Sequence, residues 1–429
     1  MSCQQIQANL FQGYLEELEL ALGALYQQGS ALDATRLVRR AKHWASAWKG
    51  DFDVPKAALL QFGMLLGRVA EAHAGADIAA GVFRLLAERA VQNVGWIPEP
   101  AAILLSAGEF NRRGGHLQEA ECYYNQAVNI LKLELVKVER RTAVHKELGR
   151  LYYELAYLHR LRGNCGSEKS AYERSETECD LACDTVGAVI ARAGLYQISL
   201  DEGNADAAVR GLTACATEFQ RLAVAPEIDP GRRGFAQRWF FNVRFSLVQA
   251  HLATGSHAAA RQLLDDVRSK ALAILSTYTS KVIEAKICLA EDDLAGAERA
   301  VAESWTVIES QDGLEAAEQA AATVAISGLI HALGHSEESA RSLLVQACGL
   351  RRDLNNSTAQ GWAWAGRAIL ARDAGDREEY WSALHQGLSA VESCSTPVRA
   401  FLHEILRNSY ATRLSPDLND LKVLVCRSG

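Results

Sequence analysis

The chain has little proline, 7 residues in 429. Proline interrupts a helix because it removes a backbone hydrogen-bond donor and clashes with the preceding turn, so segments without proline can form uninterrupted helices. The prolines cluster, as in Pro98/Pro100 and Pro226/Pro230, and we expect breaks between helices there. Apolar residues make up 49% of the chain and charged residues 23%, an ordinary balance for a folded protein, which argues against extensive disorder.

An excess of basic charge is also absent, since the formal net charge is −7. Nucleic-acid-binding domains usually carry a basic excess. The short Lys/Arg clusters at 39–49 and 137–146 are interrupted by acidic or apolar residues, as on a solvated helix face. No stretch approaches the roughly 20 consecutive apolar residues that span a bilayer. We therefore expect neither a nucleic acid nor a membrane as partner.

The N-terminal residues lack the basic and apolar segments of a secretory signal. Ten cysteines are scattered through the chain and do not follow disulfide-framework spacings, which favours a reducing, cytoplasmic location. Cys179 and Cys183 lie one helical turn apart, and Cys165 could approach them, but no second Cys-x-x-Cys pair completes a zinc site. We expect Cys179 and Cys183 to be core residues and expect no metal.

Motifs of catalysis are missing as well. The chain has no phosphate-binding Gly-Lys-Ser/Thr loop, no His-Glu-x-x-His and no Gly-x-Ser-x-Gly. His251 and His331 occupy equivalent positions in two repeats, which indicates packing and not a catalytic pair. Glu291, Asp292 and Asp293 fall on a turn, where carboxylates cap the next helix. We expect no enzymatic activity and no cofactor.

What the chain does contain is an internal repeat, in which alanine is followed by an apolar residue four positions on and a small or apolar residue three further. The clear copies are Ala34/Val38/Ala41, Ala120/Tyr124/Ala127, Ala208/Leu212/Cys215, Ala260/Leu264/Val267, Ala297/Val301/Ser304 and Ala340/Leu344/Ala347; weaker copies begin at Ala80, Glu168 and Tyr380. A turn residue stands five positions before most of these anchors, namely Gly29, Gly75, Gly115, Gly163, Gly203, Gly255, Asp292 and Gly375.

The spacing explains the repeat physically. Residues at i, i+4 and i+7 share one helix face, and small residues at its ends let a second helix approach closely. A glycine with positive φ ends the preceding helix, so that a short turn joins two antiparallel helices. One pair cannot cover its own apolar face, whereas stacked pairs can. The nine anchors therefore predict an all-α fold of about nine antiparallel helix pairs.

One repeat identifies a family. Residues 105–127 resemble a tetratricopeptide repeat (TPR), with Gly108, Gly115, Ala120, Tyr124 and Ala127 at family-typical positions. Further copies are seen at Val248/Gly255/Ala260/Leu264 and Gly328/Ala340/Leu344/Ala347, and Trp364 stands at the family's first-helix aromatic position. The resemblance implies a right-handed α-solenoid. The period near 40 residues exceeds the family's usual period of about 34, and is similar to longer-helix variants in bacterial regulators and signalling scaffolds. HEAT-type helix pairs are the competing solenoid class.

The breaks divide the chain into four expected segments. Residues 1–95 form N-terminal helical repeats, 96–221 the best-matching TPR-like repeats, 222–236 a loop or linker, and 237–429 C-terminal repeats with a terminal capping helix. The polar residues 352–360 predict a further loop before the last repeat.

The TPR resemblance implies a binding surface, because the first helix of each TPR pair lines the concave groove. On the matching helices, the residues implied to face a ligand are Glu109, Arg112, Arg113, Arg150, Tyr153, Tyr157, Arg160, Asn242, Phe245 and Gln249. Guanidinium groups bind carboxylates bidentately, and aromatic and amide side chains suit a peptide, so an acidic or C-terminal peptide segment is the expected ligand.

Two functions follow from this surface. The first is a non-enzymatic adaptor or scaffold that binds a partner protein or peptide in the concave face. The second is a regulatory sensor, in which the same array closes around a peptide or small ligand and switches a partner enzyme or transcription factor. Self-association through an uncapped end of the array stays open.

Overall fold

The structure is a computed structural model, and it describes a defined part of the chain. The described residues are 100–135, 141–271, 277–308, 314–334, 336–349, 358–391, 397–410 and 416–427, with Gly13, Glu16, Ala80, Phe83, Arg84 and Ala87. They divide into two compact units, one spanning 1–147 with 312–314 and the other spanning 148–311 and 315–429. The predicted anchor at Ala34 and the turn residues Gly29 and Gly75 lie outside the described residues.

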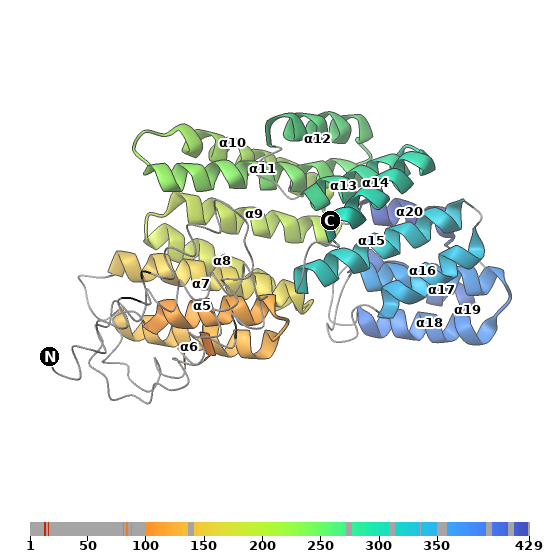
Figure 1. Ribbon diagram of the computed structural model, residues 1–429, viewed down its shortest axis with the longest axis horizontal. Helices are drawn as coiled ribbons and strands as arrows, with labels where there is room; N and C mark the ends of the chain where they lie inside the picture. Colours follow the sequence, from red (N-terminus) through yellow and green to blue (C-terminus); the bar gives the residue numbers. More distant parts are fainter. Residues whose placement is uncertain are drawn as a thin grey trace. The chain divides into compact units, whose positions relative to one another are not determined.

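These described residues form sixteen helices and no strand (Figure 1), which confirms the all-α prediction. The first helices of the pairs, called A helices below, are α5 (Pro100–Arg113), α7 (Arg141–Leu161), α9 (Thr185–Asp201), α11 (Pro230–Ala253), α13 (Thr277–Ala290), α15 (Leu314–Leu333) and α17 (Thr358–Asp373). The second or B helices are α6 (Leu117–Glu134), α8 (Cys165–Leu181), α10 (Ala205–Val224), α12 (His257–Ala271), α14 (Leu294–Ile308), α16 (Glu337–Gly349) and α18 (Arg377–Ala390). Two more helices follow the seventh pair, α19 (Pro397–Tyr410) and α20 (Leu418–Arg427).

The repeat anchors are buried positions of the B helices. Ala120, Ala208, Ala260, Ala297 and Ala340 are each 0% exposed. The two anchors that depart from alanine are also buried: Glu168 is 3% exposed and Tyr380 is 7% exposed. The repeat therefore continues through the helix pairs in which its sequence is degenerate.

The predicted turn residues have the predicted conformation. Positive φ angles between 60° and 85° are found at Gly115, Gly163, Gly203, Gly255, Gly375 and Asp292. In these turns the amide after the turn residue donates back into the preceding helix, as from Ser256 N to His251 O at 2.8 Å. Because a left-handed residue reverses the chain within a few positions, each turn places the B helix antiparallel to its A helix.

Cys183 is a turn residue that the sequence analysis did not find. It has a φ of 55° and is exposed between α8 and α9, so the prediction that it is a core cysteine is wrong. Only Cys179 of the pair is buried. The next residue, Asp184, caps α9 by accepting a hydrogen bond from Gly187 N at 3.1 Å. This turn has cysteine where most of the others have glycine, which is why the pattern missed it.

The predicted loop at 222–236 is shorter than expected, because α10 ends at Val224 and α11 begins at Pro230. Proline is tolerated in the first turn of a helix, where its missing N–H has no partner to lose. Asp229 caps α11 by accepting a hydrogen bond from Arg232 N at 3.0 Å. The two prolines and two glycines therefore mark a tight helix start and not a linker.

The two helices after the last pair, α19 and α20, have different neighbours. α19 packs on α17 and α18, so it covers the last pair. α20 instead folds back and contacts α11, α13 and α17 (Figure 1). Leu421, Val425 and Cys426 are its buried residues, and they join a core cluster with side chains of α13 and α17.

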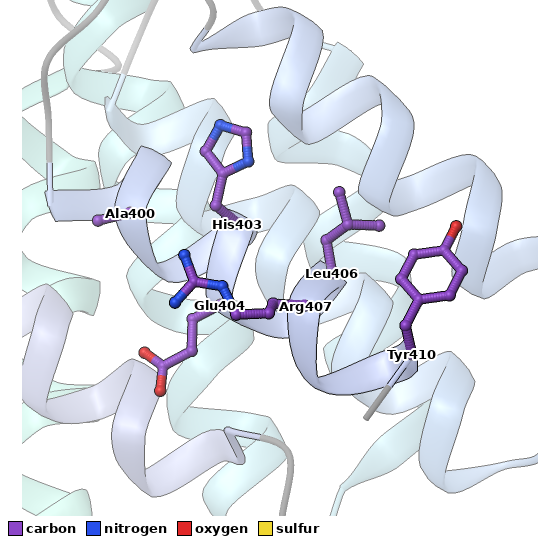
Figure 2. A pocket seen from close by; sticks show the side chains of 6 residues that line it. All are labelled: Ala400, His403, Glu404, Leu406, Arg407 and Tyr410. Atoms are coloured by element: carbon purple, nitrogen blue, oxygen red, sulfur yellow. The ribbon is translucent and has the colours of Figure 1, made fainter. Parts of the chain in front are cut away.

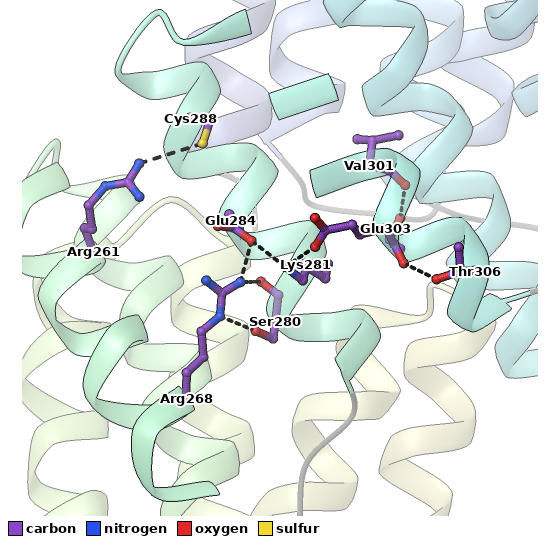
Figure 3. Close-up of polar contacts among 10 residues, drawn as sticks. Arg261, Arg268, Ser280, Lys281, Glu284, Cys288, Val301, Glu303 and Thr306 are labelled. Atoms are coloured by element: carbon purple, nitrogen blue, oxygen red, sulfur yellow. Dashed lines mark hydrogen bonds and ion pairs between the residues drawn. The ribbon is translucent and has the colours of Figure 1, made fainter. Parts of the chain in front are cut away.

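Polar contacts fasten α12, α13 and α14 together (Figure 3). Arg268 of α12 donates to Ser280 Oγ at 2.7 Å and to Glu284 Oε2 at 2.6 Å, both on α13. Lys281 of α13 lies 3.2 Å from the same Glu284 carboxylate and also pairs with Glu303 of α14. These ion pairs fix the register of three consecutive helices at their solvent side.

The close approach of α7 and α8 gives a direct test of the packing. A Cβ atom added at Gly149 would lie 2.5 Å from the Cys179 Sγ atom, and Ser175 Oγ already donates to Gly149 O at 2.7 Å. We expect Gly149→Ala to destabilise the fold by about 1–3 kcal/mol through overpacking. Gly166→Ala in the exposed first turn of α8 meets no atom within 4 Å and is the matched control.

Chemical denaturation of both variants measures the effect. The control is expected to keep the wild-type free energy of unfolding or to gain less than about 1 kcal/mol from reduced backbone entropy. Equal stability of the two variants would contradict the close helix contact.

Candidate functional site

The A helices carry a row of polar side chains at one equivalent position. Tyr157, Gln197, Gln249 and Lys286 each lie six residues before the positive-φ residue that ends their helix turn, on α7, α9, α11 and α13. α11 contacts both α9 and α13, so consecutive members of this polar row lie on neighbouring helices. Gln197 and Lys286 are buried, and Tyr157 and Gln249 are half-buried. Burial of polar side chains at a repeated position lowers the free energy of unfolding unless these side chains form hydrogen bonds or ion pairs with each other or with a ligand.

An ion pair joins α7 and α9 next to this row. Arg160 Nη2 lies 3.0 Å from Asp201 Oδ2, and the side chains are 34% and 28% exposed. Burial raises the pKa of the Asp201 carboxyl, while Arg160 and Gln197 oppose this rise. For Arg160 burial acts to lower the pKa, but Asp201 and Glu168 outweigh it, so the pKa is raised and the guanidinium stays charged. These two partly exposed side chains lie where α7 and α9 meet.

Glu168 adds a second carboxyl near Arg160 and Asp201. It stands at the anchor position of α8, where other repeats have alanine, and is 3% exposed. Burial raises its pKa to about 7, against the opposing effect of Arg160. Its Oε1 atom has no hydrogen-bond partner among the described residues. Glu168 is therefore a carboxyl that changes charge near neutral pH.

Lys286, a member of the polar row, adds a second cation to Arg160. It is 4% exposed, and its Nζ atom lies 5.0 Å from the centre of the Trp362 ring of α17, a cation–π contact. Burial lowers its pKa to about 8, and Cys426 and Asp201 act in the opposite direction. The inner side chains of α7, α8, α9 and α13 thus combine two cations with two carboxyls.

The structure separates the sequence-predicted binding residues into two groups. Those that are exposed or half-buried on A helices are Glu109, Arg113, Arg150, Tyr153, Tyr157, Arg160, Asn242 and Gln249. Arg112 and Phe245 are buried instead, at 5% and 6% exposure. Phe245 packs in the core cluster of α11, α12 and α13, because the face of α11 at that position is covered by its neighbours. Neither side chain is available to a ligand on this surface.

Besides Arg160, three of the available residues have protein partners in the structure. Arg113 and Glu109 of α5 pair with each other at 2.8 Å. Tyr153 lies with its ring centre 5.9 Å from both Tyr172 and Trp239, so it links α7 to α8 and α11 as an aromatic packing residue. Tyr153 therefore shapes the surface more than it offers a free group.

A separate surface hollow of about 850 Å³ lies along α19 (Figure 2). It is lined by Ala400, His403, Glu404, Leu406, Arg407 and Tyr410, all from this one helix. Tyr410 is 78% exposed. Because the lining comes from one helix face and converges on no buried polar group, it lacks the features of a reaction site.

Neither a metal cluster nor a membrane span emerges from the part of the chain that the structure describes. No group of three or more His, Cys, Asp or Glu side chains is placed there to hold a metal ion. No described helix is long and apolar enough to cross a membrane.

Sequence analysis missed Glu168, Asp201 and Lys286 as members of the site. Glu168 was noticed only as a degenerate anchor. The equivalent position six residues before each turn was a usable signal, since it aligns Lys286 with Tyr157. The contact of Arg160 with Asp201, 41 residues apart, had no signal in the sequence.

Comparisons with known proteins show the fold. No protein-family model matches the chain, and no curated protein matches it in sequence. A crystal structure of a Rap protein complexed with the competence and sporulation factor superposes with a TM-score of 0.50 and 13% sequence identity, over 81% of this chain and 88% of that one. A crystal structure of the APC/C hetero-tetramer Cut9–Hcn1 aligns over 92% of this chain and 94% of that one at 11% identity, with a TM-score of 0.34, which is too low to indicate a common fold. The chain has a TPR-like helical-repeat fold.

Glu168 predicts a pH dependence of stability. Its pKa is about 7 in the folded protein against 4.5 for an unperturbed carboxyl. Between these values the folded chain holds a proton that the unfolded chain has lost, so this group's contribution is present at low pH and disappears as pH rises through 7. We expect Glu168→Gln to raise the free energy of unfolding at pH 8 by on the order of 2–3 kcal/mol, and to change it little at pH 4.5.

Urea denaturation at a series of pH values measures this. Glu173→Gln changes an exposed carboxyl of the same helix and is expected to keep the wild-type slope. If Glu168→Gln also keeps that slope, Glu168 is not a buried titrating group.

Proposed function

We propose that the protein is a non-enzymatic adaptor that binds an extended segment of a partner protein across its A helices. The observation that carries this proposal is the polar row of Tyr157, Gln197, Gln249 and Lys286 at one equivalent position of four consecutive A helices. A purely structural repeat would favour small or apolar residues at such a position, as it does at the B-helix anchors.

The dimensions of the row suit an extended chain. Packed helices lie about 8–10 Å apart, and an extended peptide advances about 3.3 Å per residue. Every third residue of a peptide that crosses the helices would therefore lie over the next A helix, where the half-buried Tyr157 and Gln249 are the members of the row that it could contact. Amide and phenol groups such as Gln249 and Tyr157 can both donate to and accept from a peptide backbone.

The charges of the site favour a partner segment with a carboxylate. Arg150 is exposed on α7, and Arg160 of the same helix is paired with Asp201. A guanidinium binds carboxylate oxygens with two parallel hydrogen bonds, which gives direction as well as affinity. An acidic or C-terminal segment is thus the preferred ligand.

Support for a ligand on such a fold comes from the Rap protein, which was solved in a complex with the competence and sporulation factor. The same observation favours a second candidate, a regulatory sensor that binds a peptide or small ligand and switches a partner enzyme or transcription factor. A sensor changes its thermal stability when the ligand alone is added, whereas an adaptor responds to its protein partner.

A cytoplasmic, bacterial regulator is the setting that we propose for this adaptor. The cysteines of the described residues are all free thiols, in keeping with a reducing compartment. The absence of a catalytic motif in the sequence supports an adaptor over an enzyme.

A pair of matched variants tests the binding surface. Arg150→Ala with Gln249→Ala removes two polar side chains from A helices, and Arg210→Ala with Gln220→Ala removes the same two residue types from the exposed face of the B helix α10. The tagged protein is purified from its native organism, the co-purifying partner is identified by mass spectrometry, and its affinity is measured by calorimetry.

We expect the A-helix variant to weaken binding at least about tenfold, because lost contacts at a peptide site cost roughly 1 kcal/mol or more each. The α10 variant is expected to bind within about twofold of wild type. Equal effects of the two variants, or a chain that has no partner and turns over a metabolite, would rule out the adaptor.

A further inference from the structure

The C-terminal helix α20 packs against A helices of its own chain. It contacts α11, α13 and α17, all first helices of their pairs, although it is the last helix of the sequence. Cys426 donates through its Sγ atom to the backbone oxygen of Lys286 at 3.4 Å, so α20 reaches the α13 end of the polar row. A segment of this chain thus shows which kind of structure the A-helix surface accepts.

The seat of α20 is small compared with the packing of the repeats. α20 has only 10 residues and buries three side chains, Leu421, Val425 and Cys426, whereas the 17-residue α9 buries nine and the 24-residue α11 buries eight. Its opposite face is solvated, with Val423 43% exposed. The contact that fixes α20 on the seat is therefore narrow, and helices with few buried side chains open locally more readily than core helices.

Polar contacts define the orientation of α20. Lys422 pairs with Asp292, the exposed turn residue after α13. Arg372 donates to the backbone oxygen of Pro416 at 2.7 Å, just before the helix begins. The ion pair is solvent-exposed on the Asp292 side, where such pairs contribute little stability but do select direction and register.

We propose that α20 is a displaceable occupant, and that its seat on α11, α13 and α17 is a docking site for an amphipathic helix of a partner protein. The chemistry of α20 defines that helix: apolar side chains at i, i+4 and i+5, as in Leu421, Val425 and Cys426, and a basic side chain at i+1 that pairs with Asp292. This inference rests on the proposed binding role of the A helices. It adds a second segment type, a helix, and an autoinhibitory element that must leave before the helix docks.

A peptide in trans tests the seat. A fluorescein-labelled synthetic peptide of residues 416–429 is titrated into the full chain, and binding is followed by fluorescence anisotropy. In Leu421→Asp with Val425→Asp the two apolar contacts of α20 are lost, which vacates the seat; Val423→Asp places the same charge on the solvated face and is the matched control. We expect the peptide to bind the double variant at least tenfold more tightly than wild type or the control.

Hydrogen exchange of the wild-type chain gives an independent readout that needs no substitution. The amides of α20 are expected to exchange at least tenfold faster than those of α13 and α17. Protection of α20 equal to that of α13 would identify it as a fixed core helix and would overturn the proposal. Equal peptide binding by all three proteins would do the same.

Sedimentation of the wild-type chain tests whether the occupant of the seat is α20 of a second copy. A dimer that the Leu421→Asp/Val425→Asp variant cannot form would show that the seat belongs to α20 of a second copy, which contradicts a partner helix. None of these readouts uses the natural partner, so they are independent of the test of the adaptor role with variants of α7 and α11. Either proposal can therefore fail while the other stands.

Discussion

The close approach of A and B helices at a small side chain is the constraint on which the rest of the structure depends. Five alanine anchors are completely buried, and six predicted turn residues hold the positive φ that returns the chain for this contact. Since each pair is built alike, equivalent positions of consecutive A helices present the same face. The polar row of Tyr157, Gln197, Gln249 and Lys286 lies at one such position, and α20 also contacts A helices.

The free-energy cost of burying ionisable side chains is the reason that Lys286 and Glu168 point to a functional site. A buried ionisable side chain loses hydration that only good partners can replace. Lys286 has the Trp362 ring beside it, and Glu168 lies near Arg160 with a pKa of about 7. Residues that serve packing alone would avoid this cost, as alanine does at the other anchors. Perturbed pKa values of this kind gather at functional sites more often than elsewhere, which is in keeping with the proposed binding surface.

Much of the fold was predictable because the repeat is local. Anchor and turn are five residues apart, so the sequence carries both halves of the signal, and even the degenerate units at Glu168 and Tyr380 keep the register. The site was less predictable. Helical phase shows that Phe245 shares a face with Gln249, but only the packing of α12 and α13 decides that Phe245 is covered. The return of α20 to α11 depends on contacts between distant parts of the chain, for which local periodicity has no signal.

The central claim is that a partner segment crosses the A helices along the polar row. Photo-crosslinking tests it most directly, with benzoyl-phenylalanine placed at position 249 on α11 or at position 220 on α10, one at a time, and the purified partner added. The account predicts a crosslinked complex from position 249 and none from position 220. Crosslinking from position 220 alone, or equally from both, would contradict it.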